Sequence, residues 1–304
     1  MDIVEVTGGE PFARWHAAMK AALERTSAPE DYVDWRRQAG DMVWLLGSED
    51  GEDVAAGIAL VGWHSPPHLS LADVRVPPAA RGRGHGRELL ERLSAWAAER
   101  GATELEGDVW EDDPASLAWA ERQGFREVGR NSRLALDLTE IEPPEQQAPP
   151  GIEIATWAER PDAVPGMYEV ACEAMPDIPG NEDSEVGTLE EWLSRDMQGS
   201  GDRPEATFVA YEGDRVGGSA KLAFSGARPH VVMHDLTGVL RSERGRGIAA
   251  ALKRTQIRWA KEHGYEKLET SNEVRNEPIR RLNERHGYRL EPGEIRVRGP
   301  LATG

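Results

Sequence analysis

The sequence contains a single cysteine, Cys172, and has no long apolar run. A lone cysteine excludes an intrachain disulfide and a cysteine-based zinc site, which fits a reducing compartment. A membrane-spanning helix needs about 18 or more consecutive apolar residues, and the acidic start MDIVEVTGGE lacks the basic and then apolar order of a signal peptide. These absences predict a cytoplasmic protein with no membrane partner.

Positive charge is also scarce. Lys and Arg number 36 against 54 Asp and Glu, giving a net charge of −18. Because phosphate contacts depend on an excess of cations, this balance argues against a nucleic-acid partner. It suits a cationic substrate, although an acidic surface also serves solubility alone. The 304 residues favour two domains, at about 100–200 residues each.

Proline is concentrated near the middle of the chain, in the segment DLTEIEPPEQQAPPG at 137–151. Prolines and acidic residues replace the apolar periodicity found on both sides, which is typical of a stiff linker. The sequence therefore predicts an N-terminal domain at 1–139, a linker at 140–150 and a C-terminal domain at 151–304.

The two halves repeat each other at a constant offset of 163 residues. The register holds over more than forty residues without a gap, and it includes two tryptophans and four glycines. Among the matched pairs are Arg81 and Arg244, Gly84 and Gly247, Trp96 and Trp259, Gly101 and Gly264, and Gly124 and Gly287. A repeat of this length predicts two copies of one fold.

Each half reads as strands and helices in a mixed α+β order rather than strict alternation. In the first half we expect strands near 3–7, 42–46, 54–63, 69–76 and 103–110, and helices near 11–26, 85–98 and 114–123. In the second half we expect strands near 152–157, 206–212, 216–224, 231–239 and 268–272, with a helix after the second glycine loop.

The glycine-rich loops lie between a strand and a helix, at 74–89 and 237–252. Glycines without Cβ atoms let backbone N–H groups converge on an anion at the positive end of a helix. Neither loop carries the Lys-Ser or Lys-Thr of a nucleoside-triphosphate loop, and neither follows a first strand as a dinucleotide fingerprint does. A phosphate-bearing ligand is favoured over a ligand-free turn because the context is duplicated.

The pattern V-x-V-x-x-x-x-R-x-x-G-x-G/A resembles the acyl-CoA-binding motif of the GNAT N-acetyltransferase superfamily. The first half matches at Val74, Val76, Arg81, Gly84 and Gly86, and the second at Val239, Arg244, Gly247 and Ala249, with Thr237 at the first valine position. The resemblance extends to Gly124-Phe125 and Gly287-Tyr288. It implies two tandem GNAT domains, each with a mixed α+β sheet.

The resemblance implies acetyl-CoA as cosubstrate and no metal. The pantetheine arm would pair with the fourth strand, the pyrophosphate would bind the loop, and a primary amine would attack the thioester directly. The residues implied are Val74, Arg75, Val76, Arg81, Gly82, Arg83, Gly84, His85, Gly86 and Arg87 in the first half, and Thr237, Gly238, Val239, Arg244, Gly245, Arg246, Gly247, Ile248, Ala249, Ala250, Asn276 and Asn283 in the second.

Departures from the family pattern favour the second half as the working one. Many members carry an Asn that contacts the cofactor and a Tyr acid at the positions of Asn276 and Asn283. The first half has Asp113 and Ala120 there, so it has lost both groups. The first domain is therefore expected to be degenerate, to bind acetyl-CoA more weakly or to be structural.

The usual glutamate base is missing from both halves, where Ser70 and Met233 stand in its place. Asp235 lies two residues after Met233, so strand alternation puts both on the same face. Asp235 is the first candidate base, and His234 is the second. Asp235 could equally order a neighbouring strand. His230 and His234 are four residues apart, but the strand between them argues against a metal site.

The predicted function is transfer of an acetyl group to a primary amine of a small molecule or peptide. A non-catalytic acyl-CoA-binding sensor or scaffold is the alternative, because the usual Glu and Tyr are absent. The acidic run at 176–192 fits a cationic acceptor or a solvated face. The chain is expected to be a monomer or a homodimer.

Overall fold

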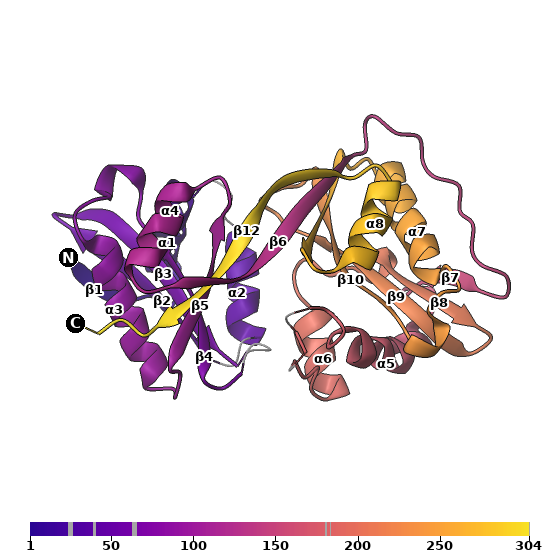
Figure 1. The fold of residues 1–304 in the computed structure, drawn as a ribbon, viewed down its shortest axis with the longest axis horizontal. Coiled ribbons are helices and arrows are strands. Elements are labelled where there is room, and N and C mark those ends of the chain that lie inside the picture. The colour runs from indigo at the N-terminus through magenta and orange to yellow at the C-terminus, as the bar shows by residue number, and fades with distance from the viewer. Residues whose placement is uncertain (24–26, 39–40, 63–65, 180, 183, 304) are drawn as a thin grey trace. The chain divides into compact units, whose positions relative to one another are not determined.

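The computed structural model describes residues 1–23, 27–38, 41–62, 66–179, 181–182 and 184–303. The chain forms two compact units, and the first of them is built from two separate stretches of sequence (Figure 1). The first unit comprises Met1–Arg130 and Glu294–Gly304, and the second comprises Asn131–Gly293.

The first unit is a mixed sheet with helices on both faces. Its strands run in the order β1-β2-β3-β4-β5-β12, in which β4 and β5 are parallel and the other neighbours antiparallel. The elements are β1 (Asp2–Glu5), α1 (Gly9–Ala22), α2 (Pro29–Gln38), β2 (Asp41–Glu49), β3 (Glu52–Val61), β4 (Leu69–Arg75), the 3-10 turn η1 (Pro78–Ala80), α3 (His85–Ala98), β5 (Glu104–Trp110) and α4 (Pro114–Arg122).

The second unit repeats this plan in the order β7-β8-β9-β10-β11-β6, with β10 and β11 parallel. Its elements are β6 (Arg126–Asp137), β7 (Glu153–Thr156), η2 (Pro161–Ala163), α5 (Val164–Ala174), α6 (Leu189–Asp196), η3 (Pro204–Ala206), β8 (Thr207–Glu212), β9 (Arg215–Phe224), β10 (Val231–Val239), η4 (Arg241–Glu243), α7 (Ile248–Glu262), β11 (Lys267–Glu273) and α8 (Glu277–Arg285). The strand that follows them, β12 (Arg289–Pro300), joins the sheet of the first unit.

The predicted α+β class with a mixed sheet is confirmed, and the expected strands and helices are present within a few residues. Two predicted ends, at Thr26 and Trp63, lie outside the described residues. The parallel pair in each sheet follows from the connection through a helix, because parallel neighbours need a crossover longer than a hairpin turn.

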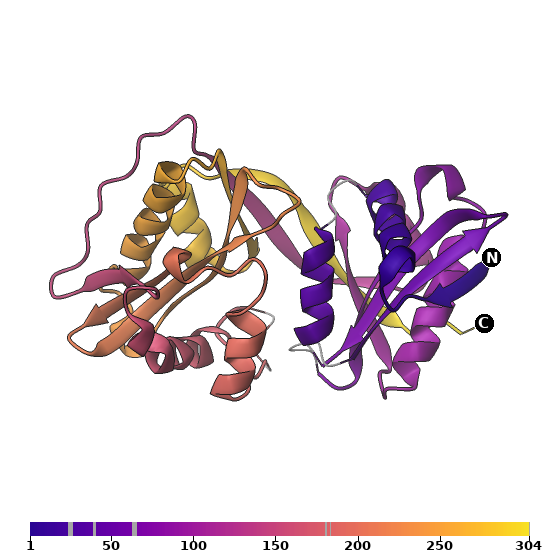
Figure 2. The same cartoon turned by 180° about the vertical axis from the view of Figure 1, so that it is seen from behind.

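Strand alternation divides each sheet between two apolar layers. In the first unit, Trp44 and Ile58 face α1 and α2, whereas Val43 and Ala59 face α3. In the second unit, α7 packs on one face and α5 and α6 on the opposite face (Figures 1 and 2). Each sheet is therefore buried on both sides, which explains the nearly continuous apolar runs of its central strands.

The last strand of each unit comes from the other half of the sequence, which the sequence did not predict. β12 completes the first sheet beside β5, with Arg298 opposite Glu106. The end of β6 completes the second sheet beside β11, with Ala135 opposite Glu269. Both glutamates are buried, and Arg298 binds Glu106 at 2.6 Å as Arg133 binds Glu269 at 2.7 Å.

The proline-rich segment contains no helix or strand between residues 138 and 150. It lies along α7, whose cations donate to its carbonyl oxygens. Arg254 bonds to Gln147 O at 2.7 Å, Arg258 to Pro144 O at 3.3 Å and Lys261 to Leu138 O at 2.6 Å. The segment is thus held on its own unit at several points.

No helix among the described residues is both long and apolar enough to cross a bilayer. The longest of them, α7, has 15 residues, which spans about 22 Å at 1.5 Å per residue.

Candidate functional site

Both glycine loops adopt the same left-handed turn before a helix. Gly82 and Gly84 have φ of 82° and 91°, and Gly245 and Gly247 have φ of 80° and 87°. A Cβ at Gly82, Gly84 or Gly245 would meet no atom within 4 Å, so the backbone conformation rather than space requires glycine. Gly84 and Gly247 are the N-caps of α3 and α7, whose first N–H groups have no intrahelical partner.

One arginine pins each loop to the strand that precedes it. Arg81 Nε donates to Val76 O at 3.0 Å, and Arg244 Nε donates to Val239 O at 3.1 Å. The repeated bond shows that this arginine fixes the loop's shape. Arg81 and Arg244, which the resemblance implies as cofactor-binding residues, therefore have a structural task in both units.

The arginines of the second loop are paired with carboxylates. Asp177 binds Arg241 and Arg244 at 2.6 Å each, and these guanidinium groups lower the pKa of Asp177 to about 2. Arg246 lies between Glu212 and Glu243. An anion at this loop would meet backbone N–H groups and the helix N-terminus rather than unpaired arginines.

The first loop differs in its surroundings. Arg87 pairs with Glu91 on the same helix, and Arg75 on β4 pairs with Asp73. His85 is buried, with Nε2 at 3.4 Å from a carboxylate oxygen of Glu49. Arg83 is exposed.

The fourth and fifth strands of each unit separate just before the loop. β4 pairs with β5 from Leu69 to Leu71, and β10 pairs with β11 from Val231 to Met233. The recorded pairing ends there in both units. Among the described residues, the later parts of β4 and β10 have no pairing with β5 and β11, and an extended ligand could pair with these backbone groups.

β10 carries a bulge that β4 lacks. His234 pairs with Leu222 and Thr237 with Ala220, so Asp235 and Leu236 lie outside the regular pairing with β9. β4 pairs with β3 without interruption from Leu71 to Arg75. Ala72 lies opposite Ala59, and His234 lies opposite Leu222, the equivalent of Ala59 in the second half. Ala72 is therefore the counterpart of His234, and from this point β10 holds one residue more than β4.

Asp235 lies at a pocket between β10 and the helices α5 and α6. Its carboxylate accepts from Lys221 at 2.8 Å, and Lys221 also bonds to Asp202 at 2.7 Å and to Asp196 O. These carboxylates raise the pKa of the buried Lys221 and outweigh its desolvation. The pocket has a volume of about 50 Å³, and its lining includes Met167, Met175, Trp192, Met197, Lys221 and Asp235.

His234 points to the opposite face of β10, beneath α7. Gln256 donates through Nε2 to Lys221 O at 3.0 Å, so its Oε1 accepts from His234 Nδ1 at 2.9 Å. Burial lowers the pKa of His234 well below its usual value, so the imidazole is neutral and its Nε2 accepts from the Tyr288 hydroxyl. Lys253 Nζ lies 5.5 Å from the centroid of the Tyr288 ring. We call His234, Lys253, Gln256 and Tyr288 the polar cluster.

The residues of α8 differ from their counterparts in α4. Asn276 is the N-cap of α8 but makes no side-chain capping bond. Asp113 caps α4 by accepting from Ser116 N at 3.0 Å and from its hydroxyl at 2.6 Å. Asn283 is fully buried and donates to Asn272 Oδ1 at 2.8 Å, whereas its own Oδ1 has no partner among the residues that the structure describes. Ala120 is buried in an apolar cluster.

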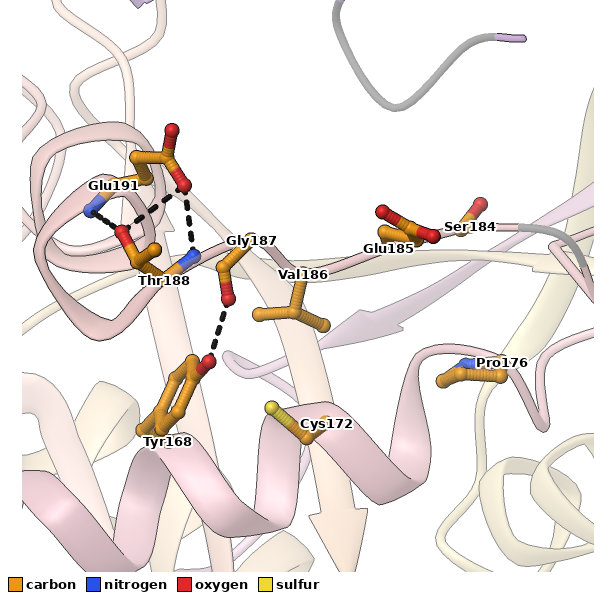
Figure 3. A pocket seen from close by; sticks show the side chains of 9 residues that line it. All are labelled: Tyr168, Cys172, Pro176, Ser184, Glu185, Val186, Gly187, Thr188 and Glu191. Carbon is orange, nitrogen blue, oxygen red and sulfur yellow. Dashed lines mark hydrogen bonds between the residues drawn. The ribbon is translucent and has the colours of Figure 1, made fainter.

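A larger hollow, of about 570 Å³, lies on the outer side of α5 (Figure 3). Tyr168 and Cys172 project from α5 toward the segment before α6, and the Tyr168 hydroxyl donates to Gly187 O at 2.5 Å. Glu191 accepts from the backbone and hydroxyl of Thr188, forming a capping box for α6. Acidic residues of the 176–192 run thus cap a helix, and Asp177 binds the loop arginines.

Sequence reasoning named Asp235 and His234 but missed the residues around them. The structure places these two on opposite faces of β10 and adds Lys221, Lys253, Gln256 and Tyr288. A signal for three of them was present, because Lys253, Gln256 and Tyr288 stand 163 residues after Leu90, Leu93 and Phe125. His230, also considered as a metal ligand, is exposed at 3.9 Å from Glu266.

Comparison with known proteins places the same architecture in one family. The model of the acetyltransferase (GNAT) family matches residues 10–125 and 164–288. Two curated proteins of Nocardia farcinica are similar in part. An L-2,4-diaminobutyric acid acetyltransferase is 30% identical over 110 residues, which is 36% of this chain and 56% of that protein. A mycothiol acetyltransferase is 35% identical over 146 residues, which is 47% of this chain and 45% of that protein.

The matched regions thus span about half the length of these curated relatives. Solved structures extend the likeness to the whole chain. A GCN5-related N-acetyltransferase from Sphaerobacter thermophilus has a TM-score of 0.74 at 23% identity, with 99% of this chain and 96% of that chain covered. A tandem GNAT protein from the clavulanic acid biosynthesis pathway has a TM-score of 0.79 at 19% identity, with 100% of this chain and 99% of that chain covered. These likenesses establish the tandem fold.

Proposed function

The chain belongs to the acetyltransferase (GNAT) family, and we propose from this membership that it transfers an acetyl group from acetyl-CoA to a primary amine in its second unit. The family uses acetyl-CoA. The observation that carries the choice of unit is the bulge of β10, which releases the backbone at Asp235 and Leu236 beside the separated strand β11. A backbone N–H released in this way can stabilise the oxyanion of a tetrahedral intermediate.

Orphaned polar atoms support cofactor binding at this place. Within the described part of the chain, Thr237 Oγ1 and Asn283 Oδ1 are buried without a hydrogen-bond partner, and Asn276 makes no side-chain capping bond. Buried polar atoms are normally paired, so a ligand with several amide and hydroxyl groups would satisfy them. The pantetheine arm of CoA has such groups, and Gly245 to Ala250 would receive its pyrophosphate.

Asp235 is the proposed acceptor of the substrate's positive charge and proton. An amine enters as an ammonium with a pKa near 10 in its ordinary state and must lose a proton before it attacks. The Asp235 side chain is 48% exposed, so it can receive an ammonium while Lys221 holds its other side. His234 is turned away from this pocket and cannot serve an amine bound there.

The pocket suggests an acceptor with a small apolar part beside its amine. Methionine and tryptophan side chains line it, and Asp235 supplies a negative charge at its edge. The similar proteins of Nocardia farcinica are named for a diamino acid and for mycothiol. We propose a small-molecule amine for this chain. The cytoplasmic location and the monomer or homodimer remain predictions.

The first unit has a similar loop but lacks the features that support catalysis. Asp113 is committed to capping α4, Ala120 belongs to the apolar core and β4 is regular. A Cβ at Gly86 would lie 3.4 Å from the Trp119 ring, so this ring occupies the space beside the helix N-terminus. We propose that this unit is degenerate or binds acetyl-CoA more weakly.

Calorimetric titration of acetyl-CoA into the full chain tests the proposal. Gly247→Glu places a carboxylate at the second loop and should abolish the tighter binding, whereas Gly84→Glu should retain it. Gly264→Ala is the control for backbone strain, because Gly264 also has a positive φ, 80°, but lies at the other end of α7. Loss of binding with Gly84→Glu alone would reverse the assignment of the units.

A non-catalytic acyl-CoA sensor or scaffold is the second candidate, favoured by the absence of a tyrosine at Asn283. Release of CoA thiol, measured with a panel of amino acids, diamines, amino sugars and peptides, separates the two functions. Turnover of any amine well above acetyl-CoA hydrolysis supports the enzyme. Tight binding of acetyl-CoA without turnover of any amine would support the sensor.

A further inference from the structure

The polar cluster exists in only one copy of the duplicated fold. Lys253, Gln256 and Tyr288 correspond to Leu90, Leu93 and Phe125 at the constant offset, and the register makes Ala72 the counterpart of His234. All of these counterparts pack in the apolar layer beneath α3. The second unit thus holds ionisable groups at positions where the same fold is stable with hydrocarbon side chains.

Lys253 is the member of the cluster that is hardest to explain by stability. It is 1% exposed, and its ammonium makes no ion pair or hydrogen bond within the part of the chain that the structure describes. Burial alone lowers the pKa of Lys253 to about 7. A buried charge without a partner destabilises a fold, so a ligand that supplies negative charge is the natural complement.

The cluster lies where β10 leaves β11. His234 follows Met233, the last residue of β10 recorded in pairing with β11, and immediately precedes the bulge. The Tyr288 hydroxyl reaches His234, and the Lys253 ammonium lies against the Tyr288 ring. A helical side chain leans toward the N-terminus of its helix, so Lys253 is directed toward the glycine loop of α7.

Other titratable groups around Lys253 do not supply the missing negative charge. His234 projects from β10, His286 and Tyr288 follow α8, and Arg254 and Arg285 lie on α7 and α8. Burial lowers the pKa of both His234 and His286, and the positive charge of Lys253 lowers it further. Tyr288 already donates its proton to His234, and Asn283, at the family's acid position, has no acidic proton. Within the cluster, Lys253 alone has a proton to give to a ligand.

We propose that Lys253 is the general acid for the departing sulfur of CoA. This inference rests on the proposed function of the second unit. The acceptor nitrogen forms a bond to the acetyl carbon, the carbon–sulfur bond breaks, and its electron pair remains on sulfur. The Lys253 ammonium donates a proton to that sulfur and becomes a neutral amine. The acceptor nitrogen loses two protons, one from the ammonium before attack and one as the amide forms, and both leave through Asp235 to water. Lys253 regains a proton from solvent after the thiol departs.

The first test is the ionisation of bound CoA, which requires no acceptor. The thiolate absorbs ultraviolet light that the thiol does not, so difference spectra against pH give the thiol pKa of bound CoA. A Gly84→Glu background restricts binding to the second loop. We expect the bound thiol to ionise at least one pH unit below free CoA, and Lys253→Met to remove that shift. An unchanged thiol pKa in Lys253→Met would overturn the proposal.

The second test is catalysis with any acceptor that the amine panel identifies. A general acid typically contributes about 10²- to 10⁴-fold, so Lys253→Met should lower kcat by at least about 100-fold with a smaller change in KM. Gln256→Leu is the matched control, because it installs the residue of the first unit in the same cluster and leaves the Lys253 ammonium in place. An equal loss of kcat in both variants, with folding intact, would assign Lys253 a structural role.

The two hypotheses fail in different ways. If the Gly84→Glu protein binds neither CoA nor acetyl-CoA, the proposed function of the second unit is wrong. If it binds both and turns over an amine, and Lys253→Met behaves as the parent does in spectra and kcat, only the role of Lys253 is wrong.

Discussion

Arg298 and Glu106 are 192 residues apart in sequence, yet Arg298 donates two hydrogen bonds to one oxygen of the Glu106 carboxylate, at 2.6 and 3.0 Å. They lie opposite each other on β12 and β5. The second unit repeats the relationship with Glu269, at the constant offset from Glu106, and Arg133 of β6. In each unit a strand from the other half of the sequence supplies the cation that satisfies a buried glutamate.

Removing that cation should destabilise the protein. Arg298→Met leaves the Glu106 carboxylate, whose side chain is 8% exposed, with only the more distant Arg296 at 3.6 Å. We expect a loss of about 1–3 kcal/mol in the free energy of unfolding, measured by urea titration. Arg281→Met removes an exposed pair with Glu277 and should change stability by less than about 0.5 kcal/mol. Equal effects of the two substitutions would contradict the argument.

Asp235 and Asp202 share Lys221, which offers a matched comparison. If Asp235 receives the substrate's proton, Asp235→Asn should lower kcat by about 10²-fold or more, as expected for loss of a general base. Asp202→Asn also deprives Lys221 of a carboxylate but leaves Asp235 in the pocket, so its effect should be at least tenfold smaller. Steady-state kinetics with an identified acceptor measure both. A similar loss in both variants would mean that the pair only positions Lys221.

Lys253 should make stability depend on pH in the alkaline range. Its pKa is about 7 in the folded protein against 10.5 ordinarily, so the unfolded chain binds more protons between these values. Stability therefore rises as pH increases from about 7 to about 10.5, and the full penalty of the buried charge is present below pH 7. Lys253→Met should be more stable than the parent at pH 6, with the difference shrinking toward pH 10. Chemical denaturation at several pH values checks this, and a constant difference would be the contrary result.

Asp177 should neutralise part of the positive charge at the second glycine loop. Asp177→Asn frees Arg241 and Arg244, which would then attract the phosphates of acetyl-CoA. We expect its affinity to increase a few-fold at low salt and the gain to shrink as salt screens the charges. Asp162→Asn, which frees Arg160 in the turn η2, is the control and should leave affinity unchanged. Weaker binding in Asp177→Asn would show that the clamp is needed for the loop's shape.

The Asp177 clamp also predicts an acid transition. Its pKa of about 2 lies below the ordinary 3.8, so the stabilisation is present above pH 4 and is lost as pH falls toward 2. The stability difference between the parent and Asp177→Asn should disappear over that interval. Unfolding midpoints between pH 2 and 5 measure it, and a difference that persists at pH 2 would exclude the ion pair as the cause.

The sequence by itself determined the repeat, the mixed α+β class and the glycine loops, because these depend on local rules. A positive φ before a helix demands glycine, and apolar periodicity reports which residues face a core. The sequence also shows that Asp113 in the first half stands at the position of Asn276 in the second. It does not show the hydrogen bond by which Asp113 caps α4.

Only the tertiary structure decided the strand exchange, the bulge and the polar cluster. β6 and β12 carry similar patterns, so nothing local tells either strand which sheet to join, and pairing is settled by partners such as Glu106 and Arg298. Strand alternation puts His234 and Asp235 on opposite faces of β10, but only the packing shows that α7 covers the face of His234 and that Asp235 lines a pocket. The unusual property of Lys253 is its burial. Burial arises from long-range packing, so the position of Lys253 in the sequence cannot show it.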